Sequence, residues 1–326
     1  MGMEDIVALS VKHYVSDLHL CDTRPPRWRR QGRLEDAPFA APDIETLLRE
    51  HLSDEQQGAW WANRQVDFAI ALANGQRLRA SAFMHQHGVS LALRILPTIC
   101  PQLAGLDVPP ALNAILTRKN GLVLVTGATG SGKSTTLAAM VDALNHRLHG
   151  HILTLEDPVE FVHHSAQCLV QQREIGLHCP SFADGLRAAL REDPDVILLG
   201  ELRDSETIRL ALTAAETGHL VLATLHTRGA AQAIERLVDT FPAQEKAPVR
   251  SQLAGSLQAV LAQTLEADRQ GGRVALFELL VNTPAVANLI REGKTHQLPG
   301  VMQTGQQAGM QTFAHSRQQR EVQGRL

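Results

Sequence analysis

The chain has 326 residues, of which 44% are hydrophobic and 20% charged, and its formal net charge is −3. The length suits two domains, and the weak negative charge argues against a chain-wide attraction to nucleic acid or anionic membranes. The four cysteines are scattered without a C-x-x-C pair, which favours free thiols in a reducing compartment. Neither a secretory signal nor an apolar run of about 18 residues is visible, so we expect a cytoplasmic protein that reaches a membrane only through partners.

The first hundred residues predict a small α+β domain. A short helix is expected over residues 4–14, a strand over 16–20 and a longer helix over 43–62. Alternating patterns predict three further strands, at residues 66–73, 77–83 and 90–96.

Five arginines lie around Trp28 between Arg24 and Arg33. Such a segment forms either a docking patch for an acidic partner or nucleic acid strand, or the solvated face of an edge strand that charge protects from pairing. The segment is short and the chain as a whole is acidic, so we favour the edge strand.

The pattern then changes to strand–helix alternation. Three of the chain's fifteen prolines fall in residues 98–110, which predicts a linker. Apolar runs without polar alternation predict parallel strands covered on both faces, at residues 122–125, 152–155, 196–199 and 220–225. Further elements are expected as helices over 182–191, 204–217 and 244–265, a strand over 273–281, a helix from Thr283-Pro284 to Gly293, and a fraying tail over 311–326.

The strongest motif follows the first of these strands. It is a glycine loop that leads into a helix and consists of Gly127, Ala128, Thr129, Gly130, Ser131, Gly132, Lys133, Ser134 and Thr135. Backbone N–H groups of such a loop and the start of the helix bind phosphate oxygens. In this pattern Lys133 reaches the β- and γ-phosphates and the Ser134 hydroxyl ligates Mg²⁺, so ATP and Mg²⁺ are the predicted ligands.

Carboxylates follow two other strands. Glu201 ends an apolar run and is placed to hold Mg²⁺ through water or to orient the attacking water, although an acid here could also serve a helix dipole. Three carboxylates lie between Glu156 and Glu160 and would repel one another without a cation or polar partner, as a base beside Mg²⁺ requires. His226 ends the fourth strand, where it is either a γ-phosphate sensor or a structural histidine.

These motifs, with Ala-Ala-Glu-Thr-Gly-His-Leu-Val-Leu-Ala-Thr-Leu-His-Thr, resemble the secretion ATPase superfamily, and within it the type IV pilus retraction (twitching motility, PilT-type) ATPases. The resemblance runs from Ser16 to Thr312. It implies an α/β protein with a PAS-like N-terminal domain (1–97), a linker (98–116), a RecA-like P-loop ATPase core (117–282) and a helical C-terminal segment (283–326). It also implies a cytoplasmic homohexamer at the inner face of the cytoplasmic membrane, bound to a pilus platform protein and not to nucleic acid.

The resemblance assigns roles to single residues. It makes Glu160 the general base and Glu201 the Walker B acid, and it places His219 and His226 in a histidine box. Arginines of the N-terminal domain complete the nucleotide site in this family, and the matching positions here are Arg77, Arg79 and Arg94. The alternative for each arginine is an exposed strand position with no catalytic role.

Three positions depart from the family pattern. His87 and Ala287 replace arginines, and the chain ends at Leu326 sooner than the resemblance implies. The absence of a tetracysteine insert favours the retraction branch over the assembly and secretion ATPases. The remaining alternatives are one of those ATPases, a nucleotide-gated regulatory paralogue without turnover, and a RecA-like motor on nucleic acid.

Overall fold

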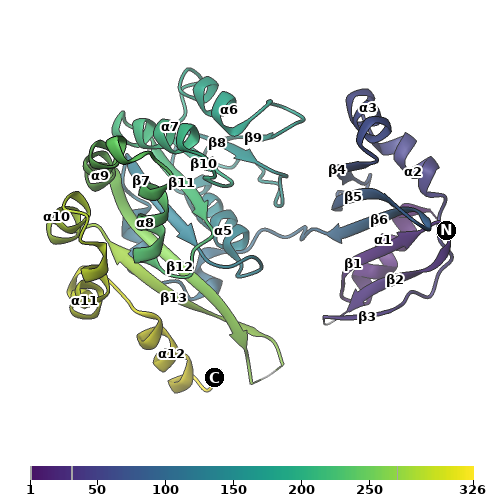
Figure 1. Ribbon diagram of the computed structural model, residues 1–326. Helices are drawn as coiled ribbons and strands as arrows, with labels where there is room; N and C mark the ends of the chain where they lie inside the picture. Colours follow the sequence, from purple (N-terminus) through teal and green to yellow (C-terminus); the bar gives the residue numbers. More distant parts are fainter. Residues whose placement is uncertain (1, 31, 270) are drawn as a thin grey trace. The chain divides into compact units, whose positions relative to one another are not determined.

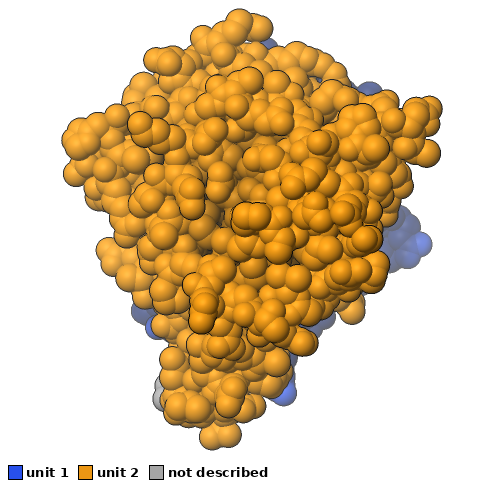
Figure 2. All heavy atoms as spheres, turned by 90° about the vertical axis from the view of Figure 1, so that its left-hand side faces the viewer, with its two compact units in different colours: residues 1–99 blue, residues 100–326 orange. Residues whose placement is uncertain are grey.

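The computed structural model describes residues 2–30, 32–269 and 271–326. The chain divides into two compact units, unit 1 (residues 1–99) and unit 2 (residues 100–326), which Figure 2 colours separately. Each unit has its own sheet and its own buried apolar core. None of the helices in the described ranges combines the length and apolarity that crossing a bilayer requires.

Unit 1 is an antiparallel six-stranded sheet covered by helices, an α+β arrangement as predicted. The strand order is β3-β2-β1-β6-β5-β4. Its strands are β1 (Val15–Cys21), β2 (Arg24–Arg30), β3 (Arg33–Asp36), β4 (Gln65–Ala71), β5 (Arg77–His85) and β6 (Gly88–Ile95). Its helices are α1 (Met3–Lys12), α2 (Ile44–His51) and α3 (Asp54–Asn63).

One face of this sheet is apolar because its strands alternate. Leu18 and Leu20 of β1 are buried while His19 between them is exposed, and the buried side chains pack with those of the three helices. The predicted helix over 43–62 is wrong in one respect, because Leu52 is extended and divides it into two. Ser53 then caps α3 by accepting the N–H of Gln56, whose side chain in turn accepts the N–H of Ser53 in a capping box.

The arginine-rich segment forms β2, which lies between β3 and β1. The edge-strand interpretation is therefore wrong in detail, since β3 is the edge. The charge is partly neutralised across the hairpin, where Arg27 pairs with Asp36 (3.2 Å) and Arg30 with Glu35 (3.1 Å). Gln31, inside the segment, lies outside the described residues.

Unit 2 is built on a seven-stranded sheet with the order β13-β12-β7-β11-β10-β8-β9 (Figure 1). Every neighbouring pair is parallel except β12 and β13. The strands are β7 (Gly121–Thr126), β8 (His151–Glu156), β9 (Leu169–Glu174), β10 (Val196–Leu199), β11 (Leu220–Leu225), β12 (Leu257–Ala267) and β13 (Arg273–Val281). The four predicted parallel strands are confirmed as β7, β8, β10 and β11.

Helices cover both faces of this sheet. The α-helices are α4 (Ala111–Ile115), α5 (Lys133–Asn145), α6 (Phe182–Ala189), α7 (Ser205–Glu216), α8 (Ala230–Asp239), α9 (Ala243–Ser256), α10 (Pro284–Arg291), α11 (Leu298–Thr304) and α12 (Phe313–Val322). Short 3₁₀ turns are η1 (Leu103–Leu106), η2 (Thr295–Gln297) and η3 (Gly305–Ala308). Leu122 and Leu124 of β7 pack with α6 to α10, whereas Val123 and Val125 pack with α4 and α5. Both faces are buried, as the unbroken apolar run predicts.

The predicted helix over 244–265 is wrong in its second half. Helix α9 ends at Ser256 and the chain continues as β12, paired in parallel with β7 and antiparallel with β13. Asn282 fixes the transition by donating to the carbonyls of Ala254 (3.0 Å) and Leu257 (2.8 Å). The apolar spacing of this segment fits a helix, but burial between two strands decides the outcome.

The predicted fraying of the tail is also wrong, because α12 packs on β13. Arg320 of α12 is buried, with its guanidinium donating to the carbonyl oxygens of Asp107 (2.9 Å) and Ala275 (3.3 Å). Residues 100–116, most of the segment predicted as a linker, lie in unit 2, where Leu103 and Leu112 are buried.

Candidate nucleotide site

The glycine loop joins the C-terminal end of β7 to α5. Gly132 caps the helix with φ +89°, and Gly130 has φ +78°, a conformation that side chains with a Cβ rarely adopt. At Gly127 the chain approaches β12 so closely that a Cβ would lie 2.4 Å from the carbonyl oxygen of Gln263. Gln263 in turn donates to the carbonyl of Ser131 at 2.6 Å and holds the loop against β12.

Lys133 closes this loop from inside. Its Nζ donates to the carbonyl oxygens of Gly127 (2.8 Å) and Ala128 (3.0 Å), and the side chain is buried. Burial lowers the pKa of Lys133, while the negative charges of Glu201 and Glu160 act in the opposite direction. The Oγ of Ser131 is buried without a hydrogen-bond partner among the described residues. A helix start, a buried ammonium and an unused hydroxyl around one loop fit a polyphosphate.

Glu201 follows β10 directly, at the sheet edge where the phosphate loop lies. Its carboxylate contacts the Nη2 of Arg203 at 2.7 Å and the Nε2 of His226 at 3.0 Å. Burial raises the pKa of Glu201, but the hydrogen bond from Arg203 and the positive charges of Arg203 and Lys133 act in the opposite direction, and the pKa is lowered overall.

His226 bridges Lys133 and Glu201. Its Nδ1 lies 3.4 Å from the Nζ of Lys133, and its Nε2 lies 3.0 Å from Glu201. A charged ammonium can only donate, so Nδ1 accepts and Nε2 carries the proton that Glu201 accepts. The ends of β7, β10 and β11 thus meet in one hydrogen-bonded array.

The predicted cluster of acids after β8 separates into different environments. Glu156 accepts from the hydroxyl of Thr154 (2.6 Å) and the amide of Gln172 (3.0 Å), which is a structural use. The negative charge of Asp157 acts on Arg203, and that of Glu160 acts on Lys133. Protein groups therefore satisfy Glu156, whereas the role of Glu160 as general base stays a prediction.

A second link, which the sequence did not predict, joins the ends of β7 and β11. The hydroxyl of Thr126, the last residue of β7, accepts the N–H of Thr227 at 2.9 Å and lies 2.7 Å from its hydroxyl. The only signal in the sequence was a threonine within two residues of the ends of the apolar runs 122–125 and 220–225.

The remaining predicted residues lie on other elements of the chain. His219 is at the opposite end of β11, where its Nδ1 lies 3.0 Å from the carbonyl oxygen of Ala214. Arg79 and Arg94 face each other across β5 and β6 of unit 1, and Arg94 pairs with Asp17 at 2.8 Å. Arg77 begins β5 in the same unit. A role for these arginines at the phosphate loop stays a prediction.

A glycine loop between a parallel strand and a helix, with an internal lysine and a glutamate after a neighbouring strand, defines the P-loop ATPases. The chain belongs to the Type II/IV secretion system protein family, whose model matches residues 62–270. Together with the relatives described below, this match confirms the predicted resemblance to the PilT-type ATPases, the α/β fold class and the predicted ATPase activity.

Three similar proteins cover nearly the whole chain. It is 72% identical over 326 residues to the "Uncharacterized protein YggR" of Escherichia coli strain K12, covering 100% of both chains. It is 48% identical to the "Type IV pilus retractation ATPase PilT" of Pseudomonas aeruginosa, over 96% of this chain and 92% of the relative. Among solved structures, the "Pilus Retraction Motor PilT and Bound ADP" matches with a TM-score of 0.91 and 41% identity, over 100% and 94% of the two chains.

Proposed function

We propose that this ATPase is a homohexameric motor that powers retraction and disassembly of a type IV pilus, or a pilus-like filament, at the inner face of the cytoplasmic membrane. The observation that carries the proposal is the array of Lys133 at the start of α5, His226 after β11 and Glu201 after β10. The similarity to the PilT retraction ATPases described above supports a role in filament retraction. A pilus platform protein is the proposed membrane partner.

The residues of unit 2 divide the chemistry between them. Backbone N–H groups of Gly130 and Gly132 bind phosphate oxygens, and Lys133 leaves the loop carbonyls to reach the β- and γ-phosphates. Ser134 and Glu201 would hold Mg²⁺, which neutralises charge on the phosphates when bound. Glu160 accepts the proton of the attacking water.

His226 is the proposed sensor of the γ-phosphate. In the described array its Nδ1 accepts from Lys133, so movement of the lysine toward phosphate frees this nitrogen. His226 keeps its contact with Glu201 through Nε2, so a change at the phosphate reaches the carboxylate.

Arginines from unit 1 are proposed to complete the site across a subunit boundary. Arg77, Arg79 and Arg94 carry positive charge to where the transition state gains negative charge, a contribution of about 10³–10⁵ in rate for such arginines. If each site needs two subunits, a closed ring lets every subunit both supply and receive an arginine.

A knockout strain tests the function. Complementation with the wild type should restore twitching and normal surface piliation, whereas Lys133→Ala should restore neither. Twitching restored by Lys133→Ala would contradict the motor role.

A second candidate is a nucleotide-gated regulator that binds ATP but does not turn it over productively. Ala287 favours it, because this buried residue of α10 stands where the retraction motif has arginine. Steady-state ATPase assays discriminate the two, since a regulator hydrolyses ATP no faster than its Lys133→Ala variant.

A nucleic-acid motor would instead show DNA- or RNA-stimulated hydrolysis with steep salt dependence. An assembly or secretion ATPase would restore pili without restoring retraction.

A further inference from the structure

Glu278 is a charged residue in the middle of β13, between the buried Phe277 and Leu279. A carboxylate in an otherwise apolar strand loses hydration unless a donor replaces the water. Burial raises the pKa of Glu278, and the backbone N–H of Ala230 acts against that shift. No residue role proposed above uses this carboxylate.

The partner of Glu278 is the first turn of α8. Its Oε1 accepts the N–H of Ala230, the first residue of the helix, at 2.9 Å. The N-cap of α8 is Gly229, which has no side chain to cap the helix. A carboxylate from a distant strand thus takes the place of the local cap and faces the positive end of the helix dipole.

Helix α8 begins directly after the segment that carries His226. This segment, residues 226–229, is held at its start by the hydrogen bond from the N–H of Thr227 to Thr126. It is held at its end by Glu278 at Ala230, and α8 packs on β12 and β13 (Figure 1). His226 lies between the end of β11 and these two anchors, so the direction of the imidazole depends on the strand and on both hydrogen bonds.

We propose that Glu278 is a positioning residue for ATP hydrolysis, because its carboxylate fixes the start of α8 and thereby the segment that aims His226 at Lys133 and Glu201. Glu278 touches neither nucleotide nor water in this scheme, which rests on the role proposed above for His226. Loss of the anchor lets the segment drift, and displacement of a reacting group by about 1 Å can lower turnover by roughly 100-fold.

The test compares Glu278→Ala, Glu278→Gln and His226→Ala by steady-state ATPase kinetics and by binding of ADP. We expect Glu278→Ala to lower kcat roughly 10- to 100-fold with unchanged affinity for ADP, since the phosphate loop is intact. Glu278→Gln should restore most of the turnover, because an amide oxygen still accepts the N–H of Ala230. A Glu278→Gln variant as slow as Glu278→Ala would overturn the proposal.

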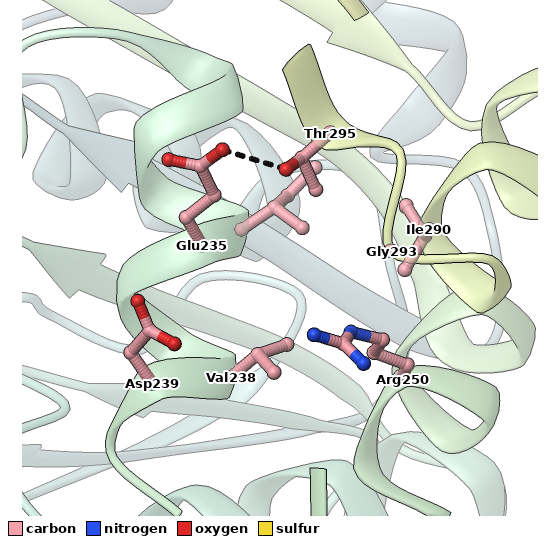
Figure 3. A pocket seen from close by; sticks show the side chains of 8 residues that line it. Glu235, Val238, Asp239, Arg250, Ile290, Gly293 and Thr295 are labelled. Carbon is pink, nitrogen blue, oxygen red and sulfur yellow. Dashed lines mark hydrogen bonds between the residues drawn. The ribbon is translucent and has the colours of Figure 1, made fainter. Parts of the chain in front are cut away.

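Glu235→Ala is the matched control. Glu235 lies on α8 and accepts from the hydroxyl of Thr295 at 2.6 Å, in a small pocket that Figure 3 shows, formed by α8, α9, α10 and the segment after α10. Both alanine variants remove one hydrogen bond of α8, but Glu235 is exposed and Glu278 is half-buried, so thermal unfolding should change less in Glu235→Ala. Only Glu278→Ala should slow hydrolysis, and equal losses of kcat would show a merely structural role.

The double variant His226→Ala/Glu278→Ala separates the possible failures. If Glu278 acts through His226, the double variant is no slower than His226→Ala alone. If the losses of kcat in the two single variants multiply fully in the double variant, Glu278 does not act through His226. The proposed role of Glu278 is then overturned, and that of His226 still stands. Wild-type turnover in His226→Ala overturns the proposed sensor, and the role of Glu278 with it.

Gly229→Ala provides the test if Glu278→Ala does not fold. A Cβ at Gly229 would lie 3.3 Å from the Oε1 of Glu278 and displace the carboxylate without removing it. We expect a smaller loss of kcat than in Glu278→Ala, again absent in the His226→Ala background. Unchanged kcat in a folded Gly229→Ala protein whose carboxylate has moved would contradict the proposal.

Discussion

The Nε2 of His226 lies 3.0 Å from the Oε1 of Glu201, so the histidine after β11 and the glutamate after β10 form a hydrogen-bonded pair. The two strands are parallel neighbours, and their residues are aligned from Val196 opposite Leu220 onward. Parallel pairing therefore brings both chain exits to the same edge of the sheet, beside the phosphate loop.

Glu201→Gln should stop turnover while leaving nucleotide binding intact. The amide keeps the size of the side chain but cannot supply negative charge to Mg²⁺ or to the attacking water. We expect kcat to fall roughly 100-fold or more, with ADP bound as by the wild type. Lys133→Ala, which loses both binding and turnover, is the reference, and near-normal hydrolysis by Glu201→Gln would show the assignment to be wrong.

Glu201 should also make stability depend on pH in acid. Its pKa in the folded protein lies below the usual 4.5, so the unfolded chain binds more protons between the two values. The stabilisation is complete above about pH 4.5 and is lost as the pH falls through the folded pKa. Urea unfolding from pH 3 to 7 should show a shallower acid slope for Glu201→Gln than for the wild type. Parallel slopes would contradict the shift.

Mixed rings test whether an arginine acts across subunits. Arg94→Ala and Lys133→Ala subunits are each inactive alone in this scheme, but a mixed ring contains sites with an intact lysine and an intact neighbouring arginine. We expect partial recovery of ATPase activity after mixing under conditions that exchange subunits. No recovery in rings shown to be mixed would count against a role in trans.

Arg320→Ala should destabilise unit 2. The guanidinium is 4% exposed, pairs with Asp107 at 3.3 Å, and donates to two carbonyl oxygens. Its removal takes a buried charged donor from the two carbonyl oxygens and from Asp107, which still contacts Arg325 at 3.5 Å, at a cost of roughly 3 kcal/mol in the free energy of unfolding. Arg317→Ala on the same helix removes a solvent-exposed ion pair and should cost less than about 1 kcal/mol. Equal urea midpoints for the two variants would contradict this reading of α12.

Cys21 should be the thiol that reacts first. Hydrogen bonds from Thr23, Ser90 and His85 outweigh the effect of burial and lower its pKa to about 7. Burial instead raises the pKa of Cys100 to about 11. Alkylation with iodoacetamide, followed by mass spectrometry, should modify Cys21 first, at a rate that rises through pH 7. Cys21→Ser should remove this fast phase, and its persistence would locate the reactive thiol elsewhere.

Local motifs predicted the elements whose causes are local. The run Leu122–Val125 and the glycine loop after it need only their own residues to be identified, and Lys133 and Glu201 were found from them. Strand β12 was missed because its apolar positions also fit a helix, and what ends α9 is Asn282, 25 residues beyond Leu257. No local pattern contains that hydrogen bond.

The same limit applies to the site and the tail. In the sequence, Glu278 is a single charged residue in an apolar strand, and its hydrogen bond to α8 is apparent only from the folded structure. In the sequence Arg320 is one charge in a polar tail, and its burial depends on contacts with Ala275 and with Asp107, 213 residues earlier. Such roles depend on topology and not on sequence neighbours.

The hydrogen bonds between Thr126 and Thr227 restrict which residues can replace Thr126 during evolution. These threonines are 101 residues apart, yet the hydroxyl of Thr126 takes up the backbone N–H of Thr227. Valine at position 126 would keep the shape and leave the N–H of Thr227 without its acceptor, whereas serine keeps the hydroxyl and loses only a methyl group. Across homologues we therefore expect position 126 to alternate between two residue types, while its apolar neighbours on β7 vary freely among aliphatic side chains.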